Sequence, residues 1–254
     1  MEGIPLGPEK WCGAWMLDSP EKGTTLLPVT DVTKALASAI EVASQRQKMT
    51  VAGARLFIRH ITAVFRGSML DAGFEARQIT RITTKFRDAG RRSAPWRATS
   101  KRVPGRPQDG DDGNRISRWK LPVGHKFYAT EIEATLVEVK YYLQAMSMAN
   151  APAMPLKDAE TAFSWLVEHD VRPGVYLDPI QLISLDLREI VQNARLLHSG
   201  HLVPLDRGGR HEPRNAFLML ARSNQLQGNM KLPELLKLMG DILDRHRAAG
   251  HLSQ

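Results

Sequence analysis

The sequence predicts an α+β fold that is mainly helical, in which a basic, helical N-terminal region precedes a C-terminal unit of two strands and a helix. Two observations carry this prediction. Apolar residues recur at helical spacing over several long stretches, whereas at residues 198–230 short apolar segments flank a Gly-Gly turn. No stretch approaches the roughly 18 consecutive apolar residues of a membrane helix, so we expect no membrane partner.

Apolar spacings of three and four residues predict N-terminal helices at 30–49, at 51–70 and at 75–89. The third of these has a basic face made by Arg77, Arg81 and Lys85. A basic helix of this kind can be the DNA-reading helix of a helix-turn-helix unit, or simply a solvated outer face. The sequence leaves both interpretations open.

The formal net charge of +8 favours an anionic partner. Between residues 77 and 106, ten basic residues stand against one acidic residue, Asp88. Residues 91–114 combine this charge with prolines and glycines, which predicts an exposed linker. We therefore expect a basic helical domain at 1–114 and a second domain at 115–254.

In the second domain, helical spacing predicts helices at 129–148, 157–169 and 233–247. We expect the last of these to cover the apolar side of the strand unit. The segment 176–197 fits a strand pair, or a strand followed by a short helix, and the pattern does not separate the two.

Cys12 is the only cysteine, which excludes an internal disulfide and a cysteine-rich zinc site. We therefore expect no structural zinc, and any metal must be held by His, Asn, Asp or Glu. The N-terminus has no basic start followed by an apolar run, so we expect a cytoplasmic protein.

The chemistry-bearing segment, 198–230, predicts a strand, a turn at Gly208-Gly209, a strand at 216–220 and a helix that begins near residue 222. Polar residues recur across these elements. His201 and Asn215 are 14 positions apart, and Asn224 follows 9 positions later.

Residue types, turn, proline and spacing together resemble the HNH (ββα-metal) nuclease family, whose usual form is Asp-His, two apolar positions, Pro, a Gly-Gly turn, Asn, and a helix bearing His or Asn. The resemblance covers 33 of 254 residues. It is greatest to the cysteine-free HNH modules of prokaryotic restriction endonucleases. It implies a ββα-metal nuclease module with a DNA-recognition region at 1–114.

The resemblance implies a site-specific, metal-dependent endonuclease of double-stranded DNA, of the type II restriction kind. We expect a homodimer, in which two active sites cut the two strands. The alternatives are a nicking, homing or phage-defence HNH nuclease, and a DNA-binding relative that has lost catalysis.

Hydrolysis of a phosphodiester requires a base that takes a proton from water, and a neutral imidazole suits this role. His201 is the candidate base. By the resemblance, Asn215 ties the loop between the strands and Asn224 is a metal ligand. We expect Mg²⁺, with Mn²⁺ as an alternative.

The sequence departs from the family pattern at Gly200, where an acidic ligand usually precedes the base. His198 is the nearest substitute, and Asp206, His211 or a distant carboxylate are alternatives. Leu220 and Ser223 stand where many relatives carry zinc-binding cysteines. The residues expected to contact DNA phosphates are Arg207, Arg210, Arg214 and Arg222 around the motif, and Arg91, Arg92, Lys101 and Arg102 in the basic segment.

Overall fold

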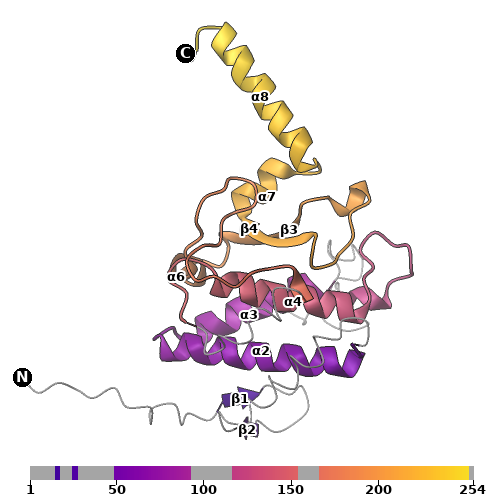
Figure 1. The fold of residues 1–254 in the computed structure, drawn as a ribbon, viewed down its shortest axis with the longest axis vertical. Helices are drawn as coiled ribbons and strands as arrows, with labels where there is room; N and C mark the ends of the chain where they lie inside the picture. The colour runs from indigo at the N-terminus through magenta and orange to yellow at the C-terminus, as the bar shows by residue number, and fades with distance from the viewer. Residues whose placement is uncertain (1–14, 18–24, 28–48, 93–115, 154–165, 252–254) are drawn as a thin grey trace, which may run out of the picture.

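The computed structural model describes residues 15–17, 25–27, 49–92, 116–153 and 166–251 (Figure 1). The expected helix at 30–49 lies almost entirely outside these ranges, as do most of the expected linker at 91–114 and of the expected helix at 157–169. Lys101 and Arg102 also lie outside the described residues. Among the described residues, no helix is long and apolar enough to cross a membrane.

Three long helices form the main layer of the molecule: α2 (Val51–Asp71), α3 (Ala76–Arg91) and α4 (Glu131–Met146). The Thr50 hydroxyl caps α2 by accepting a hydrogen bond from the backbone nitrogen of Gly53, and Thr130 and Glu133 form a capping box at the start of α4. Both α2 and α3 pack against α4 (Figure 1). The helices predicted at 51–70, 75–89 and 129–148 are confirmed.

Helix α4 is central, and its side chains are buried from Ala134 to Met146. Strand β4 (Ala216–Leu220) also contacts it. The Lys140 ammonium donates a hydrogen bond to the carbonyl oxygen of Pro213 at 2.6 Å, and the Leu218 backbone nitrogen donates to the side-chain oxygen of Gln144 at 2.9 Å. These bonds pair buried polar groups and fix the strand unit on the helical layer.

The hydrophobic core of the described residues is continuous from Met49 to Leu218. Phe65 and Phe86 each meet Tyr142 edge to face, with ring centroids 5.1 and 5.2 Å apart. Residues before and after position 114 therefore share one core. The division of recognition and catalysis between 1–114 and 115–254 stays a prediction.

The described residues contain two antiparallel strand pairs, β1 (Trp15–Leu17) with β2 (Thr25–Leu27), and β3 (Leu197–His201) with β4. The strand predicted at 216–220 is confirmed. Short 3₁₀ turns occur at Arg118–Lys120 (η3) and Leu205–Arg207 (η5).

The segment 176–197, for which the sequence left two alternatives, contains helix α6 (Leu187–Gln192) and two isolated bridges, one between Leu177 and Ser184 and one from Asp186 to Ala149. The short helix of the second alternative is therefore present. Neither strand alternative is fully realised, because isolated bridges take the place of a strand before α6.

Helices α7 (Ala221–Gln227) and α8 (Leu232–Ala248) follow the strands. The helix expected near residue 222 is confirmed, but the expectation that α8 covers the strand unit is wrong. Only Leu235 of α8 is buried, and the helix projects from the body of the molecule (Figure 1). The strands already have α4 and α7 against them, and the chain turns at Gly228, where φ is +53°, before α8 begins.

Candidate active site

One strand–loop–strand–helix unit carries the three polar residues of the motif. His201 is the last residue of β3, Asn215 immediately precedes β4, and Asn224 lies on α7. The strands pair in a register that sets His201 opposite Ala216, and α7 contacts both strands. The spacing of 14 and 9 positions therefore corresponds to the element order β–β–α.

Asn215 ties the loop between the strands. Its side-chain oxygen accepts a hydrogen bond from the Val203 backbone nitrogen at 2.8 Å, and its amide nitrogen donates to the carbonyl oxygens of Val203 and Arg210, each at 2.9 Å. At Gly209 a Cβ would lie 2.0 Å from the Val203 carbonyl oxygen. Only glycine allows the two sides of the loop to approach this closely.

His201 is linked to the helical layer through a second histidine. His201 Nε2 lies 2.9 Å from Nδ1 of His211, and His211 Nε2 lies 2.7 Å from the carbonyl oxygen of Gly90 near the end of α3. His211 is buried, with 1% of its surface exposed. Both of its ring nitrogens are therefore engaged, which leaves no nitrogen of His211 for a metal.

Both histidines are neutral near pH 7. Burial, and then the charge of the Arg118 guanidinium, lower the pKa of His201 to about 3. Burial also holds the pKa of His211 well below its ordinary value, with Arg118 and His201 contributing in the same direction. A neutral His201 keeps an unprotonated ring nitrogen, which is the first requirement for a base.

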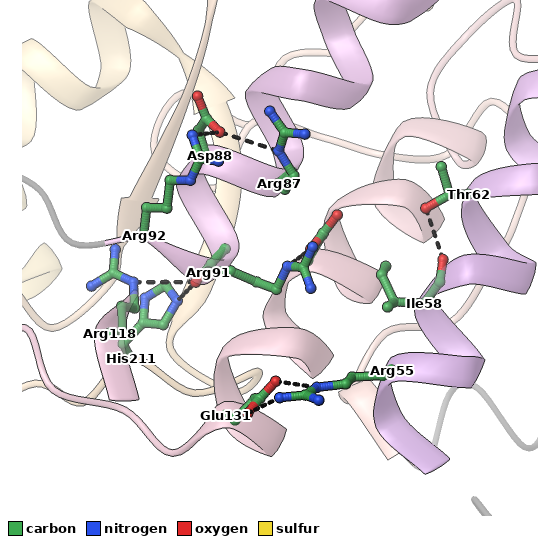
Figure 2. A network of polar contacts seen from close by, with 12 residues as sticks. Arg55, Ile58, Thr62, Arg87, Asp88, Arg91, Arg92, Arg118, Glu131 and His211 are labelled. Carbon is green, nitrogen blue, oxygen red and sulfur yellow. Dashed lines mark hydrogen bonds and ion pairs between the residues drawn. The ribbon is translucent and has the colours of Figure 1, made fainter. Parts of the chain in front are cut away.

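Arg118 holds the end of α3 in place. It is buried, and its guanidinium donates hydrogen bonds to the carbonyl oxygens of Gly90 at 3.2 Å and Ala89 at 3.3 Å. Figure 2 shows Arg118 and His211 next to each other, each with a dashed contact to the same backbone oxygen. The oxygen that His211 contacts is thus fixed from two sides.

The two candidate metal ligands lie together. The Asn224 amide nitrogen is 3.4 Å from Nδ1 of His198, which is half-buried on β3. Burial, and then the charge of Lys85, lower the pKa of His198. The unprotonated ring that a metal ligand requires is therefore favoured.

A side chain at position 200 would begin close to Asn224. A Cβ at this position would lie 3.1 Å from the side-chain oxygen of Asn224, which is where the acidic ligand of the family pattern would begin. The same Cβ would lie only 2.5 and 2.6 Å from Cε and Sδ of Met219, a fully buried residue. The thioether of Met219 therefore occupies the space of the missing side chain.

His198 and Asn224 supply only some of the ligands that a cation requires. Within the described ranges, no group of three or more His, Cys, Asp or Glu residues is arranged to hold a metal. Asp206, one alternative ligand, forms an ion pair with Lys126. One imidazole nitrogen and one amide oxygen remain, and such a pair leaves most positions of a cation to water and phosphate.

The arginines expected to contact DNA surround the unit, and most have carboxylate partners. Arg207 pairs with Glu234 at 2.9 Å, Arg210 with Glu133 at 3.2 Å, and Arg214 with Glu212 at 2.5 Å, whereas Arg222 is exposed on α7. In the basic segment, Arg91 pairs with the buried Glu138 and Arg92 with Asp88, both at 2.8 Å. Arg91 therefore has a structural partner within the helical layer.

Sequence reasoning assigned no role in the site to Gln227, Gly90 and Arg118, and it placed Lys85 only on a basic helix face. The buried Gln227 amide donates to the carbonyl oxygens of His201 and Leu202 at 2.9 and 3.1 Å, which joins α7 to the end of β3. Lys85 donates to the carbonyl oxygen of Ala194 at 2.6 Å. Gln227 stands three positions after Asn224 on one helix face, and this spacing is the only signal that the sequence offered.

Comparisons with known proteins give little further guidance. No protein-family model matches the chain, and no curated protein matches its sequence. Among solved structures, a type II restriction endonuclease is similar with a TM-score of 0.49 and 17% identity, over 68% of this chain and 80% of that chain. The chain is an α+β protein, largely helical, whose ββα unit carries His201, Asn215 and Asn224, with His201 in contact with His211 and Asn224 in contact with His198.

Proposed function

We propose that this protein is a metal-dependent endonuclease that hydrolyses phosphodiester bonds in double-stranded DNA, of the type II restriction kind. One observation carries the proposal: the residues spaced as in HNH nucleases lie at the end of the first strand, before the second strand and on the following helix. A chance match in sequence has no reason to coincide with this element order.

In this function His201 is the general base. It takes a proton from the attacking water, and Asn215 keeps the end of β3 and the following loop in place during the reaction. A pKa near 3 makes a weak base. A DNA phosphate beside the ring brings a negative charge that raises this pKa toward the useful range.

Asn224 and His198 are the proposed ligands of a divalent cation, Mg²⁺ or Mn²⁺. When bound, the cation supplies positive charge for the phosphate and the leaving oxygen. An imidazole donor favours Mn²⁺ over Mg²⁺, because Mg²⁺ prefers oxygen ligands.

Incubation of plasmid DNA with the purified protein and each cation tests the function. Discrete fragments that appear only with a divalent cation support a restriction endonuclease, and nicked circles support a nicking enzyme. DNA binding without cleavage under Mg²⁺, Mn²⁺ and Co²⁺ would instead support the inactive DNA-binding relative, the second candidate, which the glycine at position 200 favours.

DNA contact is proposed for the arginines around the ββα unit. Replacing Arg207, Arg210, Arg214 and Arg222 with Gln is expected to flatten the slope of log affinity against log salt by about 0.9 for each DNA phosphate that the variant no longer neutralises. Fluorescence anisotropy with a duplex at several salt concentrations measures the slope. Arg172→Gln, which removes an exposed arginine paired with Asp170, is the matched control. An unchanged slope in the fourfold variant would place the DNA elsewhere.

A homodimer is proposed, with α8 as its contact. An apolar stripe follows one face of this helix, with neighbours three or four residues apart: Leu232, Leu236, Met239, Ile242 and Leu243, beside the buried Leu235. Leu236 is 54% exposed and Leu243 is 44% exposed. A period close to 3.5 residues is that of a helix pair.

The stripe is symmetric about Met239, since Leu235 and Leu236 mirror Leu243 and Ile242. Lys237 and Asp241 pair with each other at 3.2 Å on the opposite face of the helix, which leaves the stripe free of charge. These features favour a second copy of this chain as the occupant of the stripe.

Met239→Glu is expected to convert the dimer to a monomer, because it sets two carboxylates against each other at the centre of the helix pair. Light scattering after size exclusion measures the mass. Arg245→Glu introduces the same charge outside the stripe and should leave the dimer intact. A wild-type protein that is monomeric at micromolar concentration would contradict the assignment.

A further inference from the structure

We propose that His211 is a positioning residue, which determines the ring nitrogen of His201 that is free to accept a proton, and that the carbonyl oxygen of Gly90 sets this choice. The inference rests on the proposed function insofar as His201 is the base. The hydrogen-bond order itself follows from the contacts of three residues.

The chain of hydrogen bonds starts at the carbonyl oxygen of Gly90, which can only accept a hydrogen bond. A backbone carbonyl oxygen carries no hydrogen, so the contact of 2.7 Å between Gly90 oxygen and His211 Nε2 requires the hydrogen to be on His211 Nε2. His211 is buried and neutral, and a neutral imidazole carries one ring hydrogen. Its Nδ1 is therefore an acceptor.

The contact between His211 and His201 then determines where His201 carries its hydrogen. His201 Nε2 lies 2.9 Å from the acceptor Nδ1 of His211, so His201 must donate through Nε2. The neutral His201 then carries its lone pair on Nδ1. Nδ1 is thus the atom that accepts a proton from water.

The opposite tautomer of His201 is disfavoured by the same contacts. With the hydrogen on Nδ1, two lone pairs would face each other across 2.9 Å, one of them on the buried ring of His211. Neither nitrogen would have a donor, and leaving buried acceptors unpaired is costly. His211 therefore favours the tautomer of His201 that carries its hydrogen on Nε2.

The hydrogen positions on His211 and His201 depend on the position of α3, the helix with the basic face. Gly90 is the penultimate residue of α3, and the Arg118 guanidinium holds the same oxygen at 3.2 Å. A displacement of this end of α3 would release His211 and allow His201 to exchange tautomers. The helix with the basic face is thereby coupled to the base of the ββα unit.

The experiment is nitrogen NMR of the full chain labelled with ¹⁵N at histidine, which distinguishes the two ring tautomers directly. His201→Gln identifies the signals of His201 by their loss. In the wild-type protein, His201 and His211 are both expected to be protonated at Nε2 alone. A wild-type His201 that carries its hydrogen on Nδ1 would overturn the proposal without any variant.

Two substitutions test His211 itself. His211→Leu should give His201 a mixture of tautomers, whereas His211→Gln should keep the wild-type one, because its amide can accept from His201 and donate to Gly90. His169→Gln, at a half-buried histidine that contacts Ser147, controls for the loss of an imidazole ring elsewhere in the fold. An unchanged His201 tautomer in His211→Leu would also overturn the proposal.

Cleavage assays of the same variants separate this inference from the proposed function. The positioning role predicts a lower kcat with unchanged KM in His211→Leu, and rescue in His211→Gln. A protein that shows the expected tautomers but cleaves no DNA would count against the nuclease function alone. A cleaving protein with the wrong tautomer would count against the role of His211 alone.

Discussion

Replacing His201 with alanine is expected to lower the rate of DNA cleavage by about 10²–10⁴-fold while changing DNA affinity only a few-fold, because a general base acts in the transition state and contributes little to ground-state binding. Single-turnover cleavage of a defined duplex measures the rate, and anisotropy without a cation measures the affinity.

The matched control is His125→Ala. His125 is an exposed histidine that accepts a hydrogen bond from the Phe127 backbone nitrogen and takes no part in the ββα unit. Its variant should cleave at the wild-type rate. A His201→Ala protein with near-normal turnover would remove His201 from the mechanism and leave His198 as the next candidate.

Acidification is expected to weaken the fold through its buried histidines. His211 is neutral in the folded protein well below pH 6.5, whereas the unfolded chain takes up a proton as the pH falls through 6.5. Stability from this residue is therefore present above pH 6.5 and is lost below it, by about 1.4 kcal/mol per pH unit. His201 and His169, with pKa values lowered to about 3 and about 4, act in the same direction.

Glu138 acts in the opposite direction. Burial raises its pKa to about 7, so the folded protein holds a proton that the unfolded chain releases above pH 4.5, and acidification from pH 7 stabilises the fold through this residue. The wild-type slope is the sum of these effects. The contribution of His211 must therefore be measured as a difference between two proteins.

Urea unfolding of the wild type and of His211→Gln at pH 7.5 and pH 5.5 measures that difference. The free energy of unfolding of His211→Gln should fall by about 1.4 kcal/mol less over this interval than that of the wild type, since glutamine does not titrate. Equal losses in the two proteins would mean that His211 takes up protons in the folded state.

The local pattern of the sequence was sufficient to predict several elements. The helices α2, α3 and α4 follow from apolar spacing, and β4 and α7 follow from the order of apolar, turn and polar residues after His201. These elements are specified by residues close in the chain. Asn215, too, forms its hydrogen bonds within the loop that it closes.

The partners of His201 were not predictable in this way. His211 meets Gly90 across 121 positions of sequence, and no local pattern marks a backbone oxygen as the end of a hydrogen-bond chain. The orientation of α8 was misjudged for a related reason. Its apolar stripe predicts that it packs against a surface, but not that α4 and α7 already pack on the strands that it was expected to cover.

Met219 fills the space next to Gly200, so substitutions at positions 200 and 219 affect each other. An acidic residue at position 200 requires the buried thioether of Met219 to move, because its Cβ would lie 2.5 and 2.6 Å from Cε and Sδ. A smaller residue at position 219, gained first, opens a cavity that costs stability but admits the acid. The effects of substitutions at positions 200 and 219 on stability are therefore not expected to add, and an acidic residue at 200 is accommodated more readily in a variant with a smaller residue at 219.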